Sequence, residues 1–146
     1  MQSLILGNPL DKNTDIGAIN SHNQLRSINK YIDIGKKEGA EIFQLNCEIP
    51  SKGYWCAPTL FTNVSQSHAI AKEEIFGPVL AVQTFRTTNE VINKANNTPY
   101  GLSAGVWTDK GSKVFNLTSK LNAGVVWANT YNLSLIHLSE PTRHCR

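Results

Sequence analysis

The sequence predicts an α/β fold, a three-layer αβα arrangement on a largely parallel sheet. From residue 79 onward, short apolar runs alternate with segments of helical periodicity, an order typical of βαβ units. A pair of capping-box signatures, at Ser21 and Thr87, marks two helix starts. The composition fits as well, since 146 residues with 40% hydrophobic and 17% charged side chains suffice for a folded core.

The first part of the chain predicts one long helix and two strands. Ser21 and Gln24 form the first capping box, and apolar residues follow at helical spacing. This helix is expected over about 21–38, with Gly39 as a left-handed terminator. Strands are expected at 40–44 and 57–64, on either side of a loop over 46–53.

The stretch KEEIFGPV, residues 72–79, organises the middle of the chain. Ser67 is expected to open a short helix, and Gly77-Pro78 must end it because proline lacks an amide donor and restricts the preceding residue. The acidic pair Glu73-Glu74 would then lie near a helix C-terminus, where the helix dipole disfavours negative charge. From these residues alone, the pair has two interpretations: solvent-exposed acidic residues without a function, or part of a functional site.

The remaining elements follow in strand–helix order. A mostly apolar strand at 79–86 is expected to be buried, and Thr87 with Glu90 starts a helix that ends before Pro99. A strand is expected at 102–108. Asp109 is expected to cap the next helix, which ends near Asn122, and 123–128 forms the last strand.

Charge and cysteine usage exclude several classes of function. The net charge is +3 with no basic run, so we expect no nucleic-acid partner and no anionic membrane partner. No apolar stretch is long enough to span a bilayer. The cysteines Cys47, Cys56 and Cys145 form no CxxC pair, and their spacing suits neither a metal site nor a disulfide framework.

The last residues differ in character from the rest. LSLIHLSEPTR, at 133–143, looks like the in-frame translation of a sequencing-library transposon adapter. We therefore expect a native body at 1–132 and a non-native, adapter-derived tail at 133–146, which is excluded from fold reasoning. A natural polar terminus is the alternative.

The body, from about residue 6 to residue 132, resembles the aldehyde dehydrogenase superfamily. The segment PLDKNTDIGAINS, at 9–21, looks most like the family's sixteenth type. Any one of the matching motifs would be a weak signal, but together they follow the family's order. They are GNPLD (7–11), GKKEGA (35–40), GY with PT (53–54 and 58–59), AKEEIFGPV (71–79), ANNTPYGLSA (95–104) and AGVVWAN (123–129).

The resemblance implies that this chain is an incomplete aldehyde dehydrogenase catalytic domain. It implies a parent enzyme that oxidises an aldehyde to a carboxylic acid with NAD or NADP, is cytoplasmic, and forms a homo-oligomer. The family's cysteine nucleophile, in a Gly-Gln-x-Cys loop, and its general-base glutamate would lie upstream in the parent, together with the large nucleotide-binding domain. Cys47 and Cys56 match neither position, so no catalytic residue is expected here and the chain itself is expected to be inactive. The alternative is a non-catalytic relative that serves as a binding or scaffolding protein.

The resemblance also assigns cofactor-binding roles. Glu74 matches the residue that holds the nicotinamide-ribose hydroxyls, and Phe76 matches the apolar contact against the nicotinamide ring. Gln24 matches a position near the adenine ribose, but a capping-box partner of Ser21 is an equally good interpretation. At the companion position, often lysine in relatives, this chain has Ser27.

Three further residues are given lesser roles. Asn129 follows the last strand and matches a supporting residue near the family's catalytic loop. Trp107 and Trp127 lie on apolar strands and are expected to belong to the core rather than to a ligand site.

Overall fold

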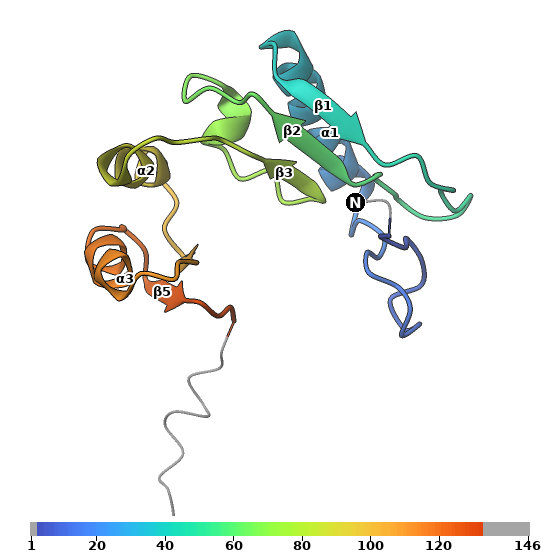
Figure 1. The fold of residues 1–146 in the computed structure, drawn as a ribbon. Coiled ribbons are helices and arrows are strands. Elements are labelled where there is room, and N and C mark those ends of the chain that lie inside the picture. Colours follow the sequence, from blue (N-terminus) through green and yellow to red (C-terminus); the bar gives the residue numbers. More distant parts are fainter. Residues whose placement is uncertain (1–2, 133–146) are drawn as a thin grey trace, which may run out of the picture. The chain divides into compact units, whose positions relative to one another are not determined.

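The computed structural model describes residues 3–132, so the predicted adapter-derived tail lies outside the described residues. The chain divides into two units, Met1–Phe85 and Arg86–Arg146, and each is described by itself (Figure 1). Among residues 3–132, no helix is both long enough and apolar enough to cross a membrane.

The first unit places one helix against a three-stranded sheet. Its elements are α1 (His22–Lys37), β1 (Glu41–Gln44), β2 (Thr59–Thr62), the short 3-10 helix η1 (Ala69–Ala71) and β3 (Val79–Ala81). The sheet order is β1-β2-β3, with β1 antiparallel to β2 and β2 parallel to β3. Figure 1 shows α1 lying across one face of this sheet.

Helix α1 begins and ends as its sequence predicts. The Ser21 side chain accepts a hydrogen bond from the Gln24 amide, and Gly39 follows the helix with φ 87°. The buried face of α1 carries Ile28 and Ile32, which share one hydrophobic core with Phe61 on β2. Apolar residues before and after the strands complete that core: Ala40, Cys56, Val64, Ile70 and Ile75.

Strand β3 differs from the prediction in length and burial. It spans Val79–Ala81 rather than 79–86, and the exposed fraction of Leu80 is 61%. Side chains alternate between the two faces of a strand, so Val79 and Ala81 pack toward the α1 side while Leu80 points to the opposite face. The expectation of a buried strand over 79–86 was therefore wrong. The helix predicted from Ser67 is also reduced to η1, which begins at Ala69.

The second unit contains a short βαβ element preceded by a helix. It comprises α2 (Thr88–Ala95), β4 (Ser103–Val106), α3 (Gly111–Thr118) and β5 (Val125–Ala128). Strands β4 and β5 pair in parallel, as the strand–helix–strand order predicts. The described strands nevertheless form two sheets rather than one, since β3 pairs with β2 and β4 pairs with β5.

The two helices of this unit test two cap predictions with opposite results. Thr87 caps α2, and its side chain accepts from the Glu90 amide. Asp109 does not cap α3: the N-cap is Lys110, whose amide bonds to the Thr108 hydroxyl. The chain turns one residue later than predicted because Thr108 supplies the local turn, and α3 ends at Thr118, before Asn122.

Candidate functional site

The segment 74–78 is anchored by the buried side chain of its second residue. Ile75 is 9% exposed and belongs to the core of the first unit, whereas its neighbours Glu74 and Phe76 are both exposed. At the end of the segment, the Pro78 carbonyl accepts a hydrogen bond of 2.9 Å from the Thr59 amide on β2. Glu74 and Phe76 therefore expose a carboxylate and an aromatic ring on either side of the buried Ile75 side chain.

Gln24 provides a second attachment, from the first turn of α1. Its side-chain Nε2 donates to the carbonyl oxygens of Ile75 and Phe76, at 3.1 Å each. The backbone amide of the same residue donates to the Ser21 hydroxyl at 3.2 Å. One half of the predicted capping box is thus formed, while the side chain reaches a segment that lies 51 and 52 positions further along the chain.

Phe76 adopts a backbone conformation that non-glycine residues rarely use. Its φ is +55°, in the left-handed region, and its ring is 75% exposed. Such a conformation costs about 1–2 kcal/mol and persists only where the surroundings impose it. The Gln24 bonds and the buried Ile75 are the contacts of the segment next to this residue, and strain of this kind concentrates at functional sites.

Gly77 allows the segment to pass directly against α1. A Cβ atom at this position would lie 2.5 Å from Cδ1 and 2.7 Å from Cγ1 of Ile28. Ile28 is fully buried, so it has little room to move aside. A residue without a side chain is therefore required where the segment meets the core.

The two adjacent carboxylates differ in what they contact. Glu73 interacts with a partner within the chain, and its amide also donates to the Ala69 carbonyl at 3.0 Å. Within residues 3–132, the carboxylate of Glu74 is exposed and makes no hydrogen bond or ion pair. The Glu74 carboxylate is thus available to a ligand.

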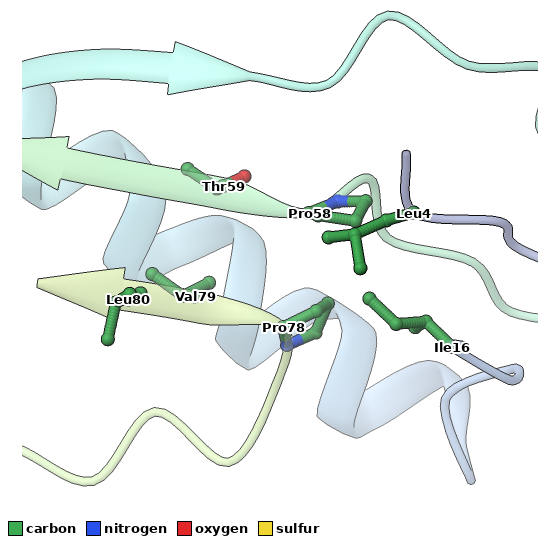
Figure 2. A pocket seen from close by; sticks show the side chains of 7 residues that line it. All are labelled: Leu4, Ile16, Pro58, Thr59, Pro78, Val79 and Leu80. Atoms are coloured by element: carbon green, nitrogen blue, oxygen red, sulfur yellow. The ribbon is translucent and has the colours of Figure 1, made fainter. Parts of the chain in front are cut away.

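An apolar pocket of about 270 Å³ lies at the ends of β2 and β3. Figure 2 shows Leu4 and Ile16 facing Pro58 and Pro78 across it. Its one polar lining residue, Thr59, already donates from its hydroxyl to the Ala57 carbonyl and accepts from the Gln44 amide. Glu74, Phe76 and Gln24 do not line the pocket, which offers no group for catalysis or for binding a charged ligand.

Two of the three residues singled out in the second unit, Asn129 and Trp127, have structural contacts. The Asn129 side chain makes two hydrogen bonds to the backbone of Thr108. Its Oδ1 accepts from the Thr108 amide at 2.9 Å, and its Nδ2 donates to the Thr108 carbonyl at 3.0 Å. These two hydrogen bonds connect the residues that follow β4 and β5. Trp127 is half-buried and packs edge-on against Tyr131, whereas Trp107 is 62% exposed, so its expected core position was wrong.

The two cysteines in the described part of the chain differ in burial. Cys56 is buried, and this burial raises the pKa of its thiol above the ordinary value, which keeps it protonated at neutral pH. Cys47 is half-buried. Within residues 3–132, no group of three His, Cys, Asp or Glu side chains is placed to hold a metal ion.

Comparison with known proteins decides the family. A sequence model described as "Aldehyde dehydrogenase family" matches residues 1–140. The chain belongs to the aldehyde dehydrogenase family. The predicted α/β class and the predicted family are both confirmed, while the narrower assignment to the sixteenth type stays a prediction. The match extends into the segment 133–146 without deciding its origin.

Individual aldehyde dehydrogenases support this assignment. Aldehyde dehydrogenase B of Escherichia coli is 43% identical over 143 residues, covering 94% of this chain and 28% of that protein. Cytosolic aldehyde dehydrogenase 1 of Rattus norvegicus is 45% identical over 127 residues, covering 87% of this chain and 25% of that protein. The NAD+ complex of the Bacillus cereus aldehyde dehydrogenase matches with a TM-score of 0.82 at 45% identity, over 90% of this chain and 27% of that one. The chain thus spans about a quarter of the length of these relatives.

Sequence reasoning did not identify how the site is supported. Ile75 as the anchor and Gln24 as a donor to the segment depend on contacts between distant positions, and no local pattern announces them. The one available signal was the glutamine in the capping box, because its side chain carries donors as well as the acceptor that the helix start uses.

Proposed function

We propose that this chain is part of a longer aldehyde dehydrogenase that oxidises an aldehyde to a carboxylic acid with NAD or NADP. In that enzyme, residues 74–76 form one wall of the site for the nicotinamide end of the cofactor. The observation that carries the proposal is the placement of the Glu74 carboxylate and the Phe76 ring on either side of a buried Ile75.

Glu74 has the chemistry needed to hold a ribose. A carboxylate offers two oxygens, each able to accept a hydrogen bond from one hydroxyl of a diol, and charge strengthens both bonds. The Glu74 carboxylate has no competing partner among the described residues, so binding a diol breaks no contact there.

Phe76 supplies an exposed apolar surface on a backbone that is held in place. The cofactor, when bound, supplies the hydride acceptor, and the part of this chain is to hold the acceptor ring in place. An aromatic ring presented at a fixed backbone position limits the orientations that a neighbouring planar ring can adopt, which favours a reactive geometry. The backbone of Phe76 is fixed on both sides, by Ile75 in the core and by Gly77 against Ile28.

The proposal is tested in a full-length aldehyde dehydrogenase that contains this chain. Glu74→Gln should raise KM for the cofactor about 10- to 100-fold, because a charged acceptor becomes a neutral one. Glu73→Gln is the matched control, since it removes the same charge one residue away, and it should leave KM within about twofold. An unchanged KM in Glu74→Gln would overturn the proposed role of this wall.

A further inference from the structure

We propose that Gln24 is a positioning residue that holds the backbone of Ile75 and Phe76 so that Glu74 and Phe76 face the cofactor. This inference rests on the proposed function of residues 74–76 and adds the residue that holds their backbone in position. It gives Gln24 a role through the protein backbone, in place of a hydrogen bond donated to the cofactor.

The two hydrogen bonds report a particular backbone conformation. In an extended strand, the carbonyls of successive residues point to opposite sides, so one nitrogen does not reach both. Here a single Nε2 lies 3.1 Å from the carbonyl oxygens of both Ile75 and Phe76. The left-handed φ of +55° at Phe76 turns the two carbonyls toward the same donor. The Gln24 amide therefore selects the strained conformation over the extended one.

Gln24 is itself well fixed, which a positioning residue requires. It lies in the first turn of α1, where its backbone amide is held by the Ser21 hydroxyl at 3.2 Å. One turn later, Ile28 of the same helix lies under Gly77. Helix α1 thus holds the segment from both ends of the strained residue, through polar contacts at Gln24 and through packing at Ile28.

The geometry also limits direct contact between Gln24 and a cofactor. A side-chain amide carries two N–H donors, and both are directed at backbone carbonyls here. The oxygen Oε1 is the part of the amide that remains to accept a hydrogen bond. A donated bond to a ribose would require the contacts with Ile75 and Phe76 to break.

The test uses Gln24→Met in the full-length enzyme, because methionine keeps the length of the side chain and removes both donors. We expect KM for the cofactor to rise about tenfold and kcat to fall, since two hydrogen bonds no longer hold the strained segment. Thr87→Ala is the control: it removes a helix cap of the same kind in the other unit and should lower thermal stability with no change in KM.

A double-mutant cycle with Glu74→Gln separates the alternatives. If Gln24 acts by aiming Glu74, the second substitution adds little to the effect of the first, and the two effects on KM are strongly non-additive. Additive effects would overturn the positioning role and favour a direct contact between Gln24 and the cofactor. A normal KM in Gln24→Met beside a raised KM in Glu74→Gln would overturn the inference alone. A normal KM in Glu74→Gln would overturn the proposed function itself.

Discussion

Helices α1 and α2 begin with the same chemistry and then use it differently. In both, a hydroxyl, of Ser21 or of Thr87, accepts from the amide three residues on. In α2 the side chain of that third residue, Glu90, turns back and accepts from the Arg86 amide at 2.8 Å. In α1 the corresponding side chain, Gln24, leaves the helix start and binds the segment 74–78.

This difference shows how the residues of a helix cap can also support a distant site. The closed box of α2 satisfies two amides of its own helix start and needs no other part of the chain. In α1, only the hydrogen bond from the Gln24 amide to Ser21 is formed. The Gln24 side chain instead donates two hydrogen bonds to distant carbonyls, next to the strained backbone of Phe76. The helix that departs from the local pattern is the one beside the proposed cofactor wall.

The two units also differ in how their side chains are buried. The first unit has fully buried residues from both its helix and its sheet, including Ile28 and Phe61. In the second unit, the described buried hydrophobic residues are Ile92 and Val106, and α3 has no buried residue. A strained segment is easier to hold against a close-packed core, which the first unit provides.

The largest expected effect comes from opening a cavity in the better-packed unit. Phe61→Ala should lower the free energy of unfolding by about 3–5 kcal/mol, because Phe61 is fully buried against α1. The same change at Phe115, whose side chain is 78% exposed on α3, should cost no more than about 0.5 kcal/mol. Urea denaturation of both variants, followed by circular dichroism, measures the difference. Similar costs at the two positions would show that the units are packed alike.

A second, smaller effect should follow from crowding the contact between segment 74–78 and α1. Gly77→Ala places a methyl group within 2.7 Å of Ile28 side-chain atoms and should cost about 1–3 kcal/mol of stability. Gly111→Ala is the matched control, because a Cβ there meets no atom within 4 Å. It should be neutral or slightly stabilising at the start of a helix. Thermal denaturation of the two variants tests this, and equal midpoints would contradict the close contact.

The elements set by local interactions were predictable from the sequence. Ser21, Thr87 and Gly39 mark helix ends through local interactions. In the structure, α1 starts and stops, and α2 starts, where these residues indicate. The cap of α3 was predicted wrongly because the Thr108 hydroxyl accepts from the Lys110 amide, and a pattern of residue types does not rank Thr108 against Asp109 as the turn residue.

The site was predictable only in part, because its support is long-range. The local sequence allowed two interpretations of Glu73-Glu74, a solvent-exposed acidic surface or a functional pair. The resemblance to a family assigned a cofactor-binding role to Glu74 alone. The exposure of Leu80 and the reach of Gln24 depend on which segments pack together. A single residue's neighbours along the chain do not contain that information.

The smallest effect concerns the closed box of α2 and is a dependence on pH. The Glu90 carboxylate bonds to the Lys94 ammonium at 2.7 Å and to the Arg86 amide at 2.8 Å, and these contacts lower its pKa below the ordinary value. A lowered pKa in the folded state means that the contribution to stability is complete above the unfolded carboxyl pKa of about 4.3 and disappears as pH falls through the folded value. Glu90 is on the surface, so the effect is modest and should shrink in high salt. Titration of the Glu90 side chain by NMR should give a pKa below that of a free glutamate, and Lys94→Met should raise it. An ordinary pKa would show that the box of α2 is open in solution, as the box of α1 is, and the contrast between the two helices would then lie in their distant contacts alone.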